Sequence, residues 1–252
     1  MSSFDLVADR FERYRALPGH VPLAIRGALH AHGEIDAGDP LLEVGCGTGR
    51  IGAPFIDAGD NYFGLDLSIE MLHEFEKKNL ARRPNFVQGD GCLLPFRDRA
   101  FSAVLMTNLL GAGNWRPLLL EAQRALQRRG VLAIGKTERP ADSIDAAMRG
   151  RLRELIASMG IAEPSLDHGV VTEWLRARSS HSKQITAAHW TIDRTPRQFF
   201  LRKLTAARFG SLPTDVRENA LRSLADWTEQ TIGPLDSPVS ETHHFHMELY
   251  WF

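Results

Sequence analysis

The stretch LLEVGCGTGR, residues 41–50, places glycines at three alternate positions directly after an apolar run. Glycine lacks a Cβ, so it adopts positive φ and lets the backbone approach a ligand closely. The flanking patterns predict a strand over residues 40–45 and a short helix over 50–58. A strand, a glycine-rich turn and a helix in this order are typical of an open parallel sheet, in which the first such turn lies nearest the ligand.

Strands and helices alternate through the first half of the chain. Amphipathic helical patterns separate the strand-like runs, which are residues 40–45, 61–66, 85–90, 101–110 and 131–137. Two later strand-like runs, 183–192 and 241–252, would complete a seven-stranded sheet. The alternation predicts a doubly wound α/β fold with a mostly parallel sheet and helices on both of its faces.

The alternation of strands and helices stops after Glu138, where helical patterns follow one another without strands between them. We therefore expect three parts. Residues 1–138 form the ligand-binding core with an N-terminal covering helix. Residues 139–183 form a helical insertion after the fifth strand, which acts as a lid. Residues 184–252 form the C-terminal part of the core.

Composition favours a small-molecule ligand. The chain has 252 residues and a formal net charge of −1, so no bulk charge attracts nucleic acid or an anionic membrane. No segment runs long enough without charge to span a membrane, and the first residues lack the apolar stretch of a signal peptide, so we expect a soluble cytoplasmic protein. The two cysteines, Cys46 and Cys92, indicate neither structural disulfides nor a zinc framework.

Carboxylates follow or end three of the expected strands. Asp66 lies about twenty residues beyond the glycine turn, where a carboxylate accepts hydrogen bonds from both hydroxyls of a ribose. Asp90 ends the third strand, where it can accept a hydrogen bond from an exocyclic amine such as that of adenine. With Glu43 added and no lysine nearby, the site favours a cationic ligand over a pyrophosphate. The dinucleotide fingerprint is also incomplete, because Arg50 stands at the position of its third glycine.

These residues resemble the motifs of the class I S-adenosylmethionine-dependent methyltransferases of the small-molecule type. The run from Glu43 to Gly49 matches the first motif, and Asp66 matches the second. The pair Gly89-Asp90, followed by LPF, matches the third motif. Ser102 departs from the fourth, where an Asp is common. The resemblance covers residues 35–137 and implies a Rossmann-like fold.

The resemblance also implies how S-adenosylmethionine is bound. The glycines of the first motif line its methionine part, Asp66 holds its ribose, and Asp90 with Gly91 contacts the adenine amine. A tyrosine of the leading helix closes over the cofactor. The implied cofactor-binding residues are Tyr14, Glu43, Gly45, Cys46, Gly47, Gly49, Asp66, Leu67, Met71, Asp90, Gly91, Thr107, Asn108 and Leu109.

The activity implied by the resemblance is methyl transfer to a small-molecule acceptor by in-line displacement, with S-adenosylhomocysteine as the product. A module that binds S-adenosylmethionine without transferring its methyl group is the alternative left open by fold and motifs. Nicotinamide-dependent reduction is disfavoured by Arg50 and by the acidic surroundings. The sequence specifies neither the acceptor, nor the atom methylated, nor the oligomeric state.

A displacement of this kind needs a general base only if the acceptor atom carries a proton, so no catalytic residue is obligatory. His168, His181 and His189 lie in or just after the expected lid and are weak candidates for such a base. A surface histidine is the more common explanation for each of them.

Nucleic-acid and metal sites lack support. Enzymes that methylate amines of DNA bases carry an Asn or Asp followed by two prolines and an aromatic residue, whereas Leu109 and Leu110 follow Asn108. His244 and His246 alternate on one strand, but no acid or cysteine is spaced to complete a metal site. The arginines of residues 149–153 are explained by a solvated helix face.

Overall fold

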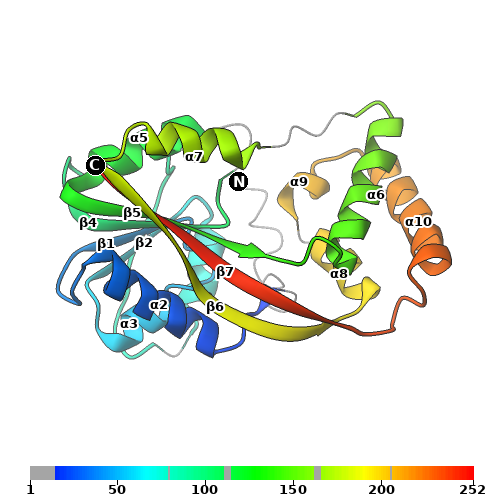
Figure 1. Ribbon diagram of the computed structural model, residues 1–252, viewed down its shortest axis with the longest axis horizontal. Coiled ribbons are helices and arrows are strands. Elements are labelled where there is room, and N and C mark those ends of the chain that lie inside the picture. Colours follow the sequence, from blue (N-terminus) through cyan, green and yellow to red (C-terminus); the bar gives the residue numbers. More distant parts are fainter. Residues whose placement is uncertain (1–14, 79, 111–114, 162–165, 205) are drawn as a thin grey trace.

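The computed structural model describes residues 15–78, 80–110, 115–161, 166–204 and 206–252. Its centre is a seven-stranded sheet in the order β3-β2-β1-β4-β5-β7-β6 (Figure 1). The first five strands run parallel, and β7 is antiparallel to both β5 and β6. The strands are β1 (Leu41–Val44), β2 (Tyr62–Asp66), β3 (Asn85–Gln88), β4 (Phe101–Thr107), β5 (Leu126–Glu138), β6 (His181–Arg194) and β7 (Val239–Trp251). The predicted fold class is confirmed.

Helices cover both faces of the sheet, as Figure 1 shows. Apolar side chains of α2, α3 and α4 pack in one cluster with alternate residues of the strands. Those of α5 and α7 pack in a second cluster on the opposite face. The helices are α2 (His20–Gly33), α3 (Ala53–Ala58), α4 (Ile69–Glu76), α5 (Trp115–Ala125), α6 (Ile144–Ser158), α7 (His168–Arg176), α8 (Pro196–Leu204), α9 (Ala207–Gly210) and α10 (Thr214–Thr231).

Strand β7 illustrates how the sequence directs side chains to the two faces. Phe245, Met247 and Leu249 point into the first cluster, whereas Tyr250 belongs to the second. This follows from the two-residue period of a strand. The inner strand β1 is buried at every residue, as expected of a parallel strand with helices on both sides.

The helix predicted over residues 50–58 begins later, at Ala53. The helical pattern before the strand-like run 131–137 ends at Ala125. Leu126 already pairs with Phe101 of β4, and the register shifts before Val131 resumes the ladder. Helix α4 starts after Ser68, whose hydroxyl accepts a hydrogen bond of 3.3 Å from the Met71 amide.

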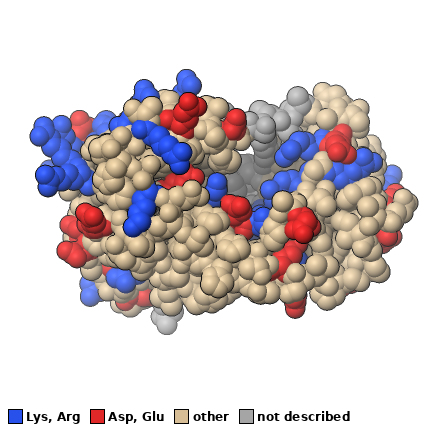
Figure 2. Space-filling view, viewed as in Figure 1, with Lys and Arg blue, Asp and Glu red and all other residues tan. Residues whose placement is uncertain are grey.

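Helices α6, α8, α9 and α10 form a third hydrophobic cluster of their own, carried at the end of the long β6–β7 ribbon (Figure 1). Helix α7 packs on the sheet, whereas α6 packs with helices that follow β6. On the face shown in Figure 2, a hollow separates the sheet from this cluster, and Lys and Arg side chains gather around it. Within the described ranges, no helix is both long and apolar enough to cross a membrane.

Candidate active site

A cavity of about 360 Å³ lies where β1, β2, β3 and β4 end. The chain order of the sheet reverses at β1, so this is the switch point at which α/β folds bind ligands. Most residues singled out from the sequence line it: Glu43, Gly45, Cys46, Gly47, Asp66, Leu67, Met71, Asp90, Gly91, Thr107, Asn108 and Leu109. Tyr14 lies outside the described residues. Sequence reasoning missed Thr48, Leu65 and Leu118, which also line the cavity.

The three glycines after β1 all adopt positive φ, with values of 73°, 54° and 74° for Gly45, Gly47 and Gly49. A Cβ on Gly47 would meet no atom within 4 Å, so this part of the turn is open. A Cβ on Gly49 would lie 2.0 Å from the Phe75 ring, and Gly49 does not line the cavity. Gly49 therefore makes room for a core aromatic, and its contact with a cofactor stays a prediction.

Asp66 holds the turns after β1 and β2 together. One carboxylate oxygen accepts a 2.8 Å hydrogen bond from the Gly47 amide, and the other accepts a 2.9 Å bond from the Ser68 amide. Asp66 is thus fixed in orientation beside the open glycine.

Glu43 is almost fully buried, with 1% of its surface exposed. The Tyr62 hydroxyl donates a 2.6 Å hydrogen bond to one oxygen of Glu43, and the Thr107 hydroxyl lies 3.5 Å from the other. Burial raises the pKa of Glu43 to about 8, although the bond from Tyr62 opposes the shift. Gly52 makes room for this pair, since a Cβ there would lie 2.2 Å from the Tyr62 hydroxyl oxygen. No sequence pattern identified Gly52.

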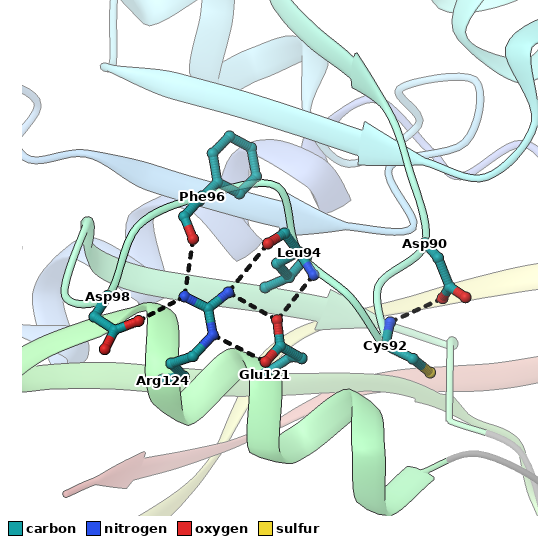
Figure 3. A network of polar contacts seen from close by, with 7 residues as sticks. All are labelled: Asp90, Cys92, Leu94, Phe96, Asp98, Glu121 and Arg124. Atoms are coloured by element: carbon teal, nitrogen blue, oxygen red, sulfur yellow. Dashed lines mark hydrogen bonds and ion pairs between the residues drawn. The ribbon is translucent and has the colours of Figure 1, made fainter.

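The loop after β3 is pinned to helix α5 (Figure 3). The Arg124 guanidinium donates to the carbonyl oxygens of Leu94 and Phe96, and it pairs with Asp98 and Glu121. Glu121 in turn accepts a 2.9 Å hydrogen bond from the Leu94 amide. At the start of this loop, Asp90 accepts a 2.8 Å bond from the amide of Cys92.

A second cavity of about 280 Å³ adjoins the first, because Asn108 and Leu109 line both. Asn108 adopts a left-handed conformation with φ of 51°, which asparagine tolerates better than most residues. Its side-chain oxygen accepts a 3.3 Å hydrogen bond from the Thr137 amide. The end of β4 thus forms the shared wall of the two cavities.

Of the three candidate bases, His168 lines the second cavity. His181 stacks on Trp251 with ring centroids 4.2 Å apart, and His189 is exposed on the edge strand β6. The three histidines that we considered as bases from the sequence therefore lie apart in the fold. Across the part of the chain that the structure describes, no group of three or more potential metal ligands occurs.

Comparison with known proteins locates a domain of a known family. The model of a methyltransferase domain matches residues 42–134, which extend from β1 into β5. This segment of the chain therefore forms a methyltransferase domain of the class I type. Demethylmenaquinone methyltransferase of Renibacterium salmoninarum is 34% identical over 106 residues, which are 41% of this chain and 43% of that protein.

Other relatives agree with this assignment. An uncharacterized methyltransferase of Mycolicibacterium vanbaalenii is 34% identical over 139 residues, covering 51% of this chain and 53% of that protein. The chain spans about half the length of the curated relatives it matches. The YcgJ protein from Bacillus subtilis shares the fold with a TM-score of 0.57 at 18% identity, over 92% of this chain and 99% of that one.

The lining of the first cavity suits S-adenosylmethionine. Two carboxylates, Asp66 and Asp90, face one arginine, Arg50, while burial favours the protonated form of Glu43, so the lining fits a ribose and a cationic group. Apolar side chains that can contact an adenine ring complete the wall: Val44, Ile51, Leu65, Met71, Leu109 and Leu118. The open position at Gly47 leaves space that a Cβ would reduce.

Alanine substitutions at Gly49 and Gly47 should lower the free energy of unfolding by different amounts. Gly49→Ala should destabilise the fold by roughly 2–5 kcal/mol, because its Cβ overlaps Phe75 and its φ is positive. Gly47→Ala should cost only about 1–2 kcal/mol of backbone strain. Urea unfolding of both variants measures the difference, and equal losses would show that backbone conformation alone governs the turn.

The raised pKa of Glu43 predicts that the stability of the fold depends on pH. This raised pKa means that the folded state binds the proton more tightly than the unfolded chain, so stability is lost as pH rises from about 4.5 toward about 8. Relative to Glu43→Gln, which keeps an oxygen for Tyr62, the wild-type free energy of unfolding should fall by at most about 1.4 kcal/mol per pH unit. Denaturant titrations between pH 5 and 8 measure both proteins, and parallel pH profiles contradict a protonated Glu43.

The contacts of Arg124 predict that its side chain stabilises the loop after β3. Arg124→Met should lower the free energy of unfolding by about 1–3 kcal/mol, because two backbone carbonyls and Glu121 lose their donor. Asp98→Asn is the control, since Asp98 is exposed and its ion pair should contribute less than about 1 kcal/mol. Similar losses in the two variants would assign the effect to surface charge instead.

Proposed function

We propose that the protein transfers the methyl group of S-adenosylmethionine to a small-molecule acceptor that occupies the second cavity. The observation that carries the proposal is the pairing of Asp66 with the amide of the open Gly47 at the end of β2. This pairing presents an oriented carboxylate beside a turn without side chains. The geometry favours a ribose on Asp66 and the methionine part along the turn.

S-adenosylmethionine supplies an electrophilic methyl group: a lone pair of the acceptor forms the new bond to carbon while the C–S bond breaks with its electrons on sulfur. The protein contributes mainly by position. Asn108 and Leu109 belong to both cavities and are the residues we assign to the boundary between cofactor and acceptor. His168 is the candidate that can receive a proton from a protonated acceptor atom, because it lines the second cavity.

Helix α7 and the helical cluster around α6 are the elements that we assign to acceptor specificity. Residues of α6 and α7 line the second cavity, including Arg149, His168 and Thr172. The boundaries 1–138, 139–183 and 184–252 remain a proposal for how core and lid are divided. A protein that binds the cofactor without transferring a methyl group remains the alternative, and turnover with an acceptor separates the two.

Calorimetric titration with S-adenosylmethionine and S-adenosylhomocysteine tests the proposal. We expect Asp66→Ala to weaken both by roughly ten- to a hundredfold, because a charge-assisted hydrogen bond contributes about 1.5–3 kcal/mol. The matched control is Asp193→Ala, an exposed acid on β6, which should bind like the wild type. Absence of binding to the wild type contradicts the proposed cofactor, and equal binding by Asp66→Ala contradicts the role of Asp66.

A further inference from the structure

We infer that the acceptor carries an oxyanion, a carboxylate or a phosphate, which binds Arg139 and Arg149 in the second cavity. This inference rests on the proposed function, since it names the class of acceptor for that site. The apolar part of the cavity wall comes from Leu109, Leu110, Ile134, Val171 and Leu175. An acceptor with an apolar body and one anionic group matches this lining.

The cationic side chains of the second cavity differ in how they are neutralised. Lys136 lies 3.9 Å from a carboxylate oxygen of Glu248, so its charge has a counterpart in the same wall. His246 lies 3.6 Å from Glu138. Arg149 has neither a hydrogen-bond partner nor an ion-pair partner among residues whose positions the structure describes. Its side chain is exposed, so a solute in the cavity can reach it.

Arg139 is only partly neutralised. Its Nε lies 3.1 Å from one oxygen of Asp145, and Asp145 also forms a short ion pair with Arg202. One carboxylate therefore serves two guanidinium groups. Arg149 and Arg194 experience the charge of Asp145 at longer range. Positive charge thus exceeds negative charge around Asp145.

Glu241, another acid that acts on Arg202, already has bonding partners. Glu241 accepts a 2.9 Å hydrogen bond from the Ile144 amide and pairs with His243 at 3.1 Å. Burial, joined by the charges of Arg194 and Arg139, lowers the pKa of Arg202 to about 10, although the charge of Asp145 opposes the shift.

An oxyanion beside Arg139 and Arg149 would reduce this repulsion. Guanidinium groups bind carboxylates and phosphates with paired hydrogen bonds, so two arginines in one wall select this chemistry over a neutral polar group. On the face drawn in Figure 2, Lys and Arg side chains lie between the sheet and the helical cluster, with Asp and Glu side chains among them. Because Asn108 and Leu109 line both cavities, the anion anchors the acceptor next to the cofactor.

The test is a ligand-observed fluorine NMR titration of the protein saturated with S-adenosylhomocysteine. The probes are 4-fluorobenzoate, 4-fluorophenyl phosphate and the neutral 4-fluorobenzyl alcohol. We expect at least one anion to bind at least tenfold more tightly than the alcohol, and the tighter anion identifies the group as carboxylate or phosphate. Equal affinity for all three probes overturns the inference.

Matched variants locate the site. Arg149→Gln should weaken the anion at least tenfold, and Arg149→Lys should retain part of the affinity. Arg153→Gln, an exposed arginine one turn further along α6, should stay within twofold of the wild type. An anion affinity that Arg149→Gln leaves unchanged places the anion elsewhere and overturns the inference.

Calorimetry with S-adenosylhomocysteine separates the two levels of the proposal. All variants should bind it within twofold of the wild type, which also shows that they are folded. If the wild type binds S-adenosylhomocysteine but discriminates no anion, the inference fails and the proposed cofactor stands. If it does not bind S-adenosylhomocysteine, the proposed function fails whatever the anions do.

Discussion

The hydrogen bonds of Asp66 connect the two turns on which the first cavity depends. Gly47 follows β1 and Ser68 precedes α4, and both donate their amides to the same carboxylate. The amide of Gly47 reaches Asp66 from a turn that adopts positive φ at three alternate residues. A side chain at Gly49 would displace Phe75, and Phe75 belongs to the cluster that holds α4 against the sheet. Ligand site and core packing therefore depend on the same turn.

Much of this arrangement follows from local sequence rules. The alternation of apolar strands and amphipathic helices predicts the sheet, and acids at the ends of β2 and β3 meet because parallel strands end at one edge. The cap at Ser68 follows from its side-chain oxygen. These features involve residues that are near in sequence or that share one sheet edge, so a pattern is enough to locate them.

Features that depend on distant packing could not be predicted in this way. The pairing of Glu43 with Tyr62 requires a glycine at position 52, and no rule links these three residues in the sequence. Arg149 resembles a solvated helix residue until α6 is placed beside β5 and β7, where it lines a cavity. The early end of α5 results from the pairing of Leu126 with Phe101, which overrides the helical pattern.

The attachment of α6 to β7 links the helical cluster to acceptor binding. Glu241 of β7 accepts the Ile144 amide at the start of α6, and Asp145 in the first turn pairs with Arg139, which follows β5. These contacts fix the beginning of α6, and Arg149 lies one turn further along the same helix. A displacement of the cluster would therefore move Arg149 relative to Asn108, the residue shared by the two cavities. The same ribbon that extends the sheet thus sets the distance between the anion site and the cofactor cavity.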